Sequence, residues 1–298
     1  FLLCVAIFRL SYIVLSDKVD GVDLKEFAKN RNTKTKTLYA SRGTIYDYQG
    51  EELALSVNSY TLIAYLSEKR TTDMNKPQHV VDKGLTAKKL SEILDIEEEK
   101  MLEYLSKDAY QVEFGSKGKN LTEKTKKEIE KLELPGIDFI EGTKRYYKMG
   151  AFASYIIGYA KTGEDGLITG ELGIESYFNE ELSGKDGSLT YQADAYGYQL
   201  PNKNSYIIPS ESGADIYLTL DSNIQMKAEN AINDLSEEYD FDWAIVTIMD
   251  AKTGAIKASA TSPNYNPNDL NTLTSYINPL VSYTYEPGST MKTFSWAA

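Results

Sequence analysis

Residues 243–261 read WAIVTIMDAKTGAIKASAT, and this stretch decides the fold class of the second half of the chain. Two β-forming runs, 243–249 and 255–261, flank a short turn that ends at Gly254. Runs of this kind around a glycine-ended turn predict an antiparallel hairpin.

A helix is predicted directly before this hairpin. Asp221 is placed to cap its first turn. Apolar residues then recur at helical spacing on one face, namely Ile224, Ala228, Ala231, Ile232 and Leu235. A strand is expected at 214–220. A helix packed on an antiparallel hairpin forms two layers, so the expected fold class is α+β, with helices on an antiparallel sheet.

The first half of the chain predicts a separate α+β domain over residues 16–208. Its expected elements are two strands around a turn that ends at Gly50, helices at 86–105 and 122–132, a short strand at 137–140, helices at 150–159 and 170–182 with Gly184 as the final cap, and a hairpin over 187–200. The segment 202–213 is polar and rich in turn residues, so we place the domain boundary between residues 208 and 209.

Residues 1–15, FLLCVAIFRLSYIVL, predict a transmembrane anchor. A helix needs about 20 apolar residues to span a bilayer, so we expect this anchor to be incomplete and to begin before Phe1. Arg9 should lie near the outer interface, because a charge at the bilayer centre is costly. The alternative is a buried core helix or strand.

Composition excludes several kinds of site. The formal net charge of −12 argues against nucleic-acid binding, which needs clustered lysine and arginine. Cys4 is the only cysteine, so no internal disulfide can form. His79 is the only histidine and lies in a polar stretch, where a surface loop is expected. No cluster has metal-ligand spacing, so neither a metal nor a cofactor is predicted.

Candidate chemistry lies near the end of the chain, at Pro287-Gly288-Ser289-Thr290-Met291-Lys292. If a helix starts here, Lys292 lies one turn after Ser289 on the same face. A serine hydroxyl is a weak nucleophile that needs a base within hydrogen-bond reach, and a lysine can serve when its neutral form is favoured. The Ser-x-x-Lys spacing alone is also common in ordinary helices.

The surroundings strengthen this interpretation. Pro-Gly-Ser-Thr-x-Lys resembles the active-site segment of penicillin-binding proteins, and the order of the upstream segments resembles class B of that family. The matching segments are Arg42-Gly43-x-Ile45-x-Asp47, Arg145-Tyr146-Tyr147 with Ile157-Gly158-Tyr159, Gly173-Ile174-Glu175, Leu218-Thr219-Leu220-Asp221, Asp250-x-x-Thr253-Gly254, and Pro263-x-Tyr265-x-Pro267-Asn268. Tyr48 and Lys148 depart from the family pattern.

This resemblance implies an N-terminal membrane helix, an elongated pedestal or dimerisation domain over 16–208, and the first part of a transpeptidase domain over 209–298. The family's later Ser-x-Asn and Lys-Thr-Gly motifs are not found after Ser289, where the family's order would place them. We therefore expect this chain to be a fragment whose C-terminal portion is poorly stable alone. The family resemblance also implies that the chain crosses the membrane once and that most of it is extracytoplasmic.

The resemblance also implies the roles of individual residues. Ser289 would be acylated by D-Ala-D-Ala stem peptides or β-lactams, its main-chain N–H would form half of an oxyanion hole, and Lys292 would act as the base. The motif residues Arg42, Gly43, Asp47, Arg145 and Glu175 would instead hold the pedestal together. Cell-wall synthesis proteins, such as a membrane glycosyltransferase, are the implied partners.

Two alternatives to a peptidoglycan D,D-transpeptidase stay open at this point. One is a catalytically incomplete scaffold that recruits wall-synthesis proteins. The other is a β-lactam sensor or β-lactamase that uses the same Ser-x-x-Lys spacing. A long pedestal argues against a simple β-lactamase.

Overall fold

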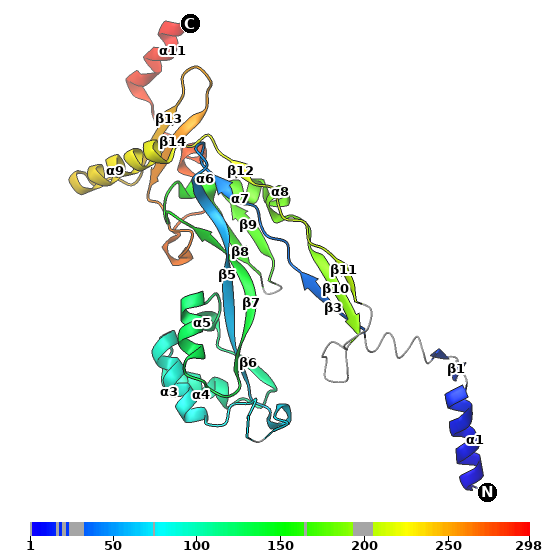
Figure 1. Cartoon of the computed structure of the whole chain (residues 1–298). Coiled ribbons are helices and arrows are strands. Elements are labelled where there is room, and N and C mark those ends of the chain that lie inside the picture. Colours follow the sequence, from blue (N-terminus) through cyan, green and yellow to red (C-terminus); the bar gives the residue numbers. More distant parts are fainter. Residues whose placement is uncertain are drawn as a thin grey trace. The chain divides into compact units, whose positions relative to one another are not determined.

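The computed structural model describes residues 2–15, 18–19, 22–23, 33–73, 75–163, 166–192 and 205–298. It divides into two compact units (Figure 1), which we describe separately. Unit 1 comprises Phe1–Ser41 and Ser183–Gly213, and unit 2 comprises Arg42–Leu182 and Ala214–Ala298.

The described part of unit 1 forms the helix α1 and two small sheets. Helix α1 spans Leu2–Leu15, and among the residues described, no helix has the length and apolar character needed to cross a membrane. Strands β1 (Lys18–Val19) and β2 (Val22–Asp23) pair antiparallel. A second sheet has the order β11-β10-β3, with bounds Tyr206–Ile208, Gly187–Gln192 and Thr33–Leu38.

The hairpin expected over 187–200 is correct only at its first strand. Strand β10 pairs antiparallel with two strands, and one of them is β11, where Ser188 pairs with Ile208. The other neighbour is β3. The rest of the predicted hairpin range, 193–200, lies outside the described residues.

Unit 2 is built on a long two-stranded ribbon. Strand β5 (Glu52–Tyr65) pairs antiparallel with β7 (Ile137–Tyr147) over the whole length of β7. On its other edge, β5 pairs with β4 (Ile45–Tyr46) and β6 (Gln111–Glu113), and β12 (Ile216–Tyr217) pairs parallel with β4. The sequence predicted a strand only at 137–140. Pairing with β5 extends this strand to Tyr147.

Three helices pack around one end of this ribbon (Figure 1), with a core that includes Leu62, Leu90, Met101 and Ile129. They are α3 (Lys83–Leu94), α4 (Glu98–Leu105) and α5 (Glu123–Glu130). The single helix predicted at 86–105 is wrong, because Asp95 adopts a left-handed conformation with φ 50° and ends α3. The predicted start of α5 is confirmed, since the Thr122 side chain accepts a hydrogen bond from the N–H of Thr125. Short turns η1 (Glu68–Arg70) and η2 (Ser116–Gly118) complete this region.

The segment from 154 to 183 is less helical than predicted. It contains α6 (Ser154–Ile157), β8 (Tyr159–Thr162), β9 (Ile168–Leu172), α7 (Gly173–Tyr177) and α8 (Asn179–Ser183). Gly158 ends α6 with φ 76°, and a Cβ there would overlap the carbonyl oxygen of Leu172. The predicted helix at 150–159 is therefore shortened to α6, and the one at 170–182 begins within β9 and continues as the two short helices α7 and α8. Periodicity cannot reveal the close approach of two chain segments at Gly158. Gly184 follows α8 with φ 70°, as predicted for a cap.

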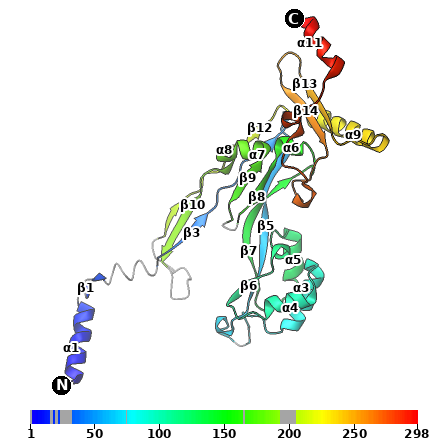
Figure 2. The same cartoon turned by 180° about the vertical axis from the view of Figure 1, so that it is seen from behind.

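In the last part of unit 2, the predicted helix and hairpin are confirmed. Helix α9 (Ser222–Glu238) is capped by Asp221 and packs on the antiparallel hairpin of β13 (Ala244–Met249) and β14 (Ile256–Ser262), as Figure 2 shows. Ala231 and Leu235, expected on the buried face, are exposed. The strand expected over 214–220 is only β12. Beyond the hairpin come η3 (Leu270–Thr272), α10 (Pro279–Ser282), η4 (Gly288–Met291) and α11 (Lys292–Ala297).

Candidate functional site

Ser289 and Lys292 lie on one continuous helical segment. Ser289 belongs to the 3-10 turn η4, and Lys292 is the first residue of α11. The turn starts because Gly288 adopts φ 55° and the hydroxyl of Thr290 donates a hydrogen bond to the carbonyl of Pro287. The two side chains are thus one turn apart, as the motif requires.

Both side chains are exposed, and no hydrogen bond joins them in the described structure. The aromatic residues that follow are exposed as well, with Phe294 at 69% and Trp296 at 89%. A lysine becomes a better base when it is desolvated or lies near other cations. The described residues around Lys292 leave its side chain exposed, so they do not desolvate it.

Aromatic packing connects the motif to the hairpin. The ring of Trp243, just before β13, packs edge-on against Tyr283 and Tyr285, with centroids 5.6 and 6.4 Å apart. These two tyrosines lead directly into Pro287-Gly288-Ser289. The hairpin therefore positions the chain just before the candidate nucleophile.

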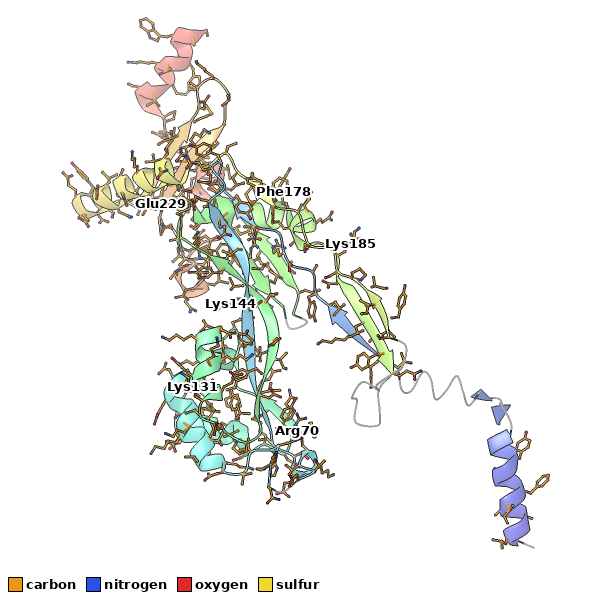
Figure 3. The ribbon with its side chains drawn as sticks, viewed as in Figure 1. Arg70, Lys131, Lys144, Phe178, Lys185 and Glu229 are labelled. Carbon is orange, nitrogen blue, oxygen red and sulfur yellow. The ribbon has the colours of Figure 1, made fainter. Side chains whose placement is uncertain are left out.

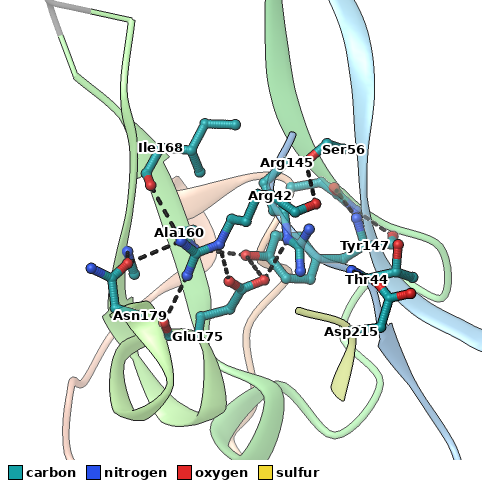
Figure 4. A network of polar contacts seen from close by, with 12 residues as sticks. Arg42, Thr44, Ser56, Arg145, Tyr147, Ala160, Ile168, Glu175, Asn179 and Asp215 are labelled. Carbon is teal, nitrogen blue, oxygen red and sulfur yellow. Dashed lines mark hydrogen bonds and ion pairs between the residues drawn. The ribbon is translucent and has the colours of Figure 1, made fainter. Parts of the chain in front are cut away.

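Three motif residues that are distant in sequence meet in one buried network (Figure 4). Glu175, with no exposed surface, accepts hydrogen bonds from Nε of Arg42 at 2.8 Å and from Nε of Arg145 at 2.6 Å. Arg42 also donates to the carbonyl of Glu175 and to the side chain of Asn179. Two guanidinium groups thus share one carboxylate and tie together β7, α7 and the chain before β4.

Tyr147 extends this network. Its hydroxyl accepts a hydrogen bond from the N–H of Ala160 at 2.6 Å and donates to Glu175 at 3.4 Å. Burial, together with the negative charge of Glu175, raises the pKa of Tyr147 well above its usual value. The hydroxyl therefore stays protonated and links β7 to β8.

Gly43 lies next to this network, where two segments of the chain touch. Its N–H donates to the carbonyl of Leu182 at 2.8 Å. An added Cβ would overlap the carbonyl oxygen of Ala214. The motif glycine therefore permits a close backbone contact.

Asp47 lies apart from the network and caps α9. Its Oδ1 accepts the N–H groups of Gln49 and Glu51, at 2.8 and 2.9 Å. Its Oδ2 accepts the N–H and the hydroxyl of Ser222, at 3.2 and 2.7 Å. Burial pushes the pKa of Asp47 upward, but the hydrogen bonds from Ser222, Glu51 and Gln49 outweigh it, so the pKa lies below its usual value.

Sequence reasoning missed several side chains that join the first and second halves of the chain. Asn268 forms two hydrogen bonds with the main chain of Tyr147. Glu229 on α9 accepts the N–H of Ala153 at 2.8 Å, and its position is shown in Figure 3. Within the second half, the buried side chain of Gln225 donates to the carbonyl of Ser259 in β14 and accepts its N–H. Nothing in the local sequence indicated these contacts, although Asn268 and Gln225 both belong to segments that match the family.

The predicted catalytic pair and the motif residues therefore occupy different places. Arg42, Gly43, Arg145 and Glu175 gather around β7, Asp47 lies at the start of α9, and Ser289 with Lys292 lies at the end of the chain. Within the described ranges, no three His, Cys, Asp or Glu side chains are close enough to hold a metal ion.

Two family models match this chain. The penicillin-binding protein dimerisation domain matches residues 37–218, and the penicillin-binding protein transpeptidase domain matches residues 244–298. The chain belongs to the class B penicillin-binding proteins. The resemblance seen in the sequence and the α+β fold class are thereby confirmed, while the membrane helix and the boundary at 208/209 stay predictions.

Relatives and solved structures agree with this family. Stage V sporulation protein D of Bacillus subtilis (strain 168) is 30% identical over 97% of this chain and 43% of its own length. The probable peptidoglycan D,D-transpeptidase PenA of Neisseria meningitidis serogroup A is 31% identical over 91% of this chain and 45% of its own. The chain therefore spans less than half of these class B relatives.

Among solved structures, penicillin-binding protein 2X from Streptococcus thermophilus is 33% identical with a TM-score of 0.63, over 87% of this chain and 40% of its own. The Helicobacter pylori penicillin-binding protein PBP2, solved in complex with MreC, is 21% identical with a TM-score of 0.58, over 80% of this chain and 44% of its own. The latter likeness concerns the fold alone.

Proposed function

We propose that the protein to which this chain belongs cross-links peptidoglycan as a serine D,D-transpeptidase. The observation that carries the proposal is the match of residues 244–298 to the transpeptidase domain, because this range contains Ser289 and Lys292. Relatives named as peptidoglycan D,D-transpeptidases support the reaction class. The placement of both side chains one turn apart supports the assignment of the two residues.

In the proposed reaction, Ser289 Oγ attacks the carbonyl carbon of the D-Ala-D-Ala bond of a stem peptide. Lys292 takes the serine proton, the main-chain N–H of Ser289 stabilises the oxyanion, and the terminal D-Ala leaves with a proton on its amine. An amine from a neighbouring stem then attacks the acyl-enzyme, and Ser289 regains its proton. A β-lactam would acylate Ser289 and stay attached.

We further propose a cell-membrane location with a single pass, in which α1 contributes to the anchor and the rest of the chain is extracytoplasmic. The apolar sequence of residues 1–15 supports this placement. Cell-wall synthesis proteins, such as a membrane glycosyltransferase, are the proposed partners. The Helicobacter pylori protein of the same fold was solved with a bound protein, so the fold is compatible with such partners.

Labelling of the full-length protein with a fluorescent penicillin tests the nucleophile. We expect native protein to be labelled and Ser289→Ala to lose the label. Ser295→Ala is the matched control, because Ser295 is an exposed serine on the same helix, and it should label normally. Persistent labelling of Ser289→Ala would assign the acylated residue elsewhere. A folded native protein that takes no label would favour the scaffold alternative.

A further inference from the structure

The outer edge of β7 borders a pocket of about 380 Å³. Its walls come from β7, from β8 and from the turn before η3, and all of them belong to unit 2. The lining includes Lys144, Arg145 and Lys161 together with Asn120 and Asn268, and none of the described lining residues is acidic. The Arg145 side chain is buried against Glu175, so Lys144 and Lys161 are the cations that the pocket can offer. In a chain of net charge −12, two lysines with no acidic residue in the described lining favour an anionic ligand.

Arg145 adds a second observation. It is 7% exposed, and its two terminal nitrogens have no hydrogen-bond partner among the described residues. The trio of Arg42, Arg145 and Glu175 carries one net positive charge. Because a buried cation without a full set of partners is costly, a nearby anion would stabilise this part of the fold.

Lys144 and Lys161 are the two lysines that line the pocket. The ammonium group of Lys144 donates to the carbonyl of Asn120 at 2.9 Å, and burial lowers its pKa. Lys161, on β8, is exposed at the opposite wall. Figure 3 shows Lys144 on the β5–β7 ribbon. Neither ammonium group has a carboxylate partner in the described structure, so both can receive one.

The backbone of β7 indicates the form of the ligand. The N–H of Lys148 bonds the carbonyl of Leu53 across the ribbon. In an antiparallel ladder the bonded residues alternate, so the N–H and C=O of Tyr147 and of Arg145 point away from β5. Among the described strands, β7 pairs only with β5, which leaves this edge open.

Asn268 shows how the outward N–H and C=O groups of β7 can find hydrogen-bond partners. Its Oδ1 accepts the N–H of Tyr147 at 3.0 Å, and its Nδ2 donates to the carbonyl of Tyr147 at 2.7 Å. A side-chain amide thus takes the place of a neighbouring strand. The next N–H and C=O groups that point away from β5 are those of Arg145, beside the pocket. Among the described residues, no side-chain amide bonds them as Asn268 bonds Tyr147.

We propose that this pocket binds an extended acidic peptide segment of another protein. The peptide main chain would pair with the open edge at Arg145, and a carboxylate side chain would lie between Lys144 and Lys161. Main-chain pairing supplies affinity in such strand additions, and side-chain pockets supply specificity. This role is independent of acyl transfer at Ser289.

The test uses the full-length protein and a synthetic hexapeptide of alternating threonine and glutamate, acetylated and amidated at its ends. Isothermal titration should detect binding, and Lys144→Gln/Lys161→Gln should weaken it about ten-fold or more. Lys88→Gln/Lys89→Gln removes the same charge from α3 and should leave affinity unchanged. Penicillin labelling and thermal unfolding confirm that each variant is folded.

Two further probes separate the main-chain contact from simple charge attraction. A hexapeptide N-methylated at alternate residues, which keeps every carboxylate, should bind about ten-fold or more weakly. Hydrogen exchange at the Arg145 amide should slow when the unmodified peptide binds. Absence of binding, equal binding by the N-methylated peptide or by free glutarate, or an unchanged affinity in the Lys144/Lys161 variant would each overturn the proposal.

Discussion

Asp47 accepts two hydrogen bonds from Ser222, which lies 175 positions later in the chain, through the serine N–H at 3.2 Å and its hydroxyl at 2.7 Å. A residue of the turn between β4 and β5 thereby caps α9, the first helix of the second half. This contact is one of several that join 42–182 to 214–298 within one compact unit. The pedestal strands and the start of the transpeptidase segment are packed as one body.

Replacement of Asp47 should destabilise unit 2. We expect Asp47→Asn to lower the free energy of unfolding by about 1.5–3 kcal/mol, the usual worth of hydrogen bonds to a charged group. Urea unfolding of native and variant protein measures this difference. Asp250→Asn is the control, because Asp250 caps only an exposed turn; an equal loss there would contradict a special role for Asp47.

The same residue gives a pH dependence with a defined sign. The folded pKa of Asp47 lies below its ordinary value of 3.8, so the unfolded chain binds this proton first as the pH falls. The stability due to Asp47 is therefore full above that ordinary value and is lost as the pH falls through the folded pKa. The difference in unfolding free energy between native and Asp47→Asn protein should shrink below pH 3.8. A difference that grows with acidity would show the opposite linkage.

Among the motif residues, replacement of Glu175 should cause the largest loss of unfolding free energy. Glu175→Gln keeps the shape but leaves two buried guanidinium groups without a carboxylate, and we expect a loss of about 3–5 kcal/mol. Thermal and urea unfolding measure the loss. Glu211→Gln removes the carboxylate of an exposed pair with Lys185, where the side chains are 69% and 79% exposed, and it should change stability little. Similar effects of both substitutions would show that burial of the network contributes nothing.

Asn268 offers a test of the clasp on β7. In Asn268→Asp the carboxylate can accept the N–H of Tyr147 but cannot donate to its carbonyl, so we expect a loss of about 1–3 kcal/mol at neutral pH. The carbonyl should raise the carboxyl pKa, so acidification should reduce the penalty by supplying a donor, opposite in sign to Asp47. Asn233→Asp, on the exposed face of α9, is the control. A penalty that stays constant with pH would argue against the clasp.

Gly158 and Gly254 form a matched pair with φ values of 76° and 75°. An alanine at either position is strained by about 1–2 kcal/mol. At Gly158 the new Cβ would also overlap the carbonyl of Leu172, whereas at Gly254 nothing lies within 4 Å. Gly158→Ala should therefore destabilise clearly more than Gly254→Ala in urea unfolding. Equal effects would mean that the contact with Leu172 relaxes without cost.

Local chemistry determined the elements that the sequence predicted well. The hairpin at 243–261, the cap at Asp221, the start of α5 at Thr122 and the glycine after α8 all depend on residues within a few positions of one another. Each has a specific preference, such as a capping side chain or a left-handed glycine, so the pattern is visible in the chain itself. Each family motif likewise consists of residues that lie within a few positions of one another, so it can be read from the sequence.

Contacts between distant residues decided the rest. The full length of β7 depends on pairing with β5, the strands near Gly158 depend on a close approach of two segments, and Glu175 meets Arg42 and Arg145 only after folding. The outward-facing edge at Arg145 and the pocket beside it also require the register of the ribbon. The sequence determined which residues could form caps and turns, and it indicated the candidate nucleophile. Only the tertiary structure decided which charges are buried together, because their pairing energy depends on distance and burial rather than on order in the chain.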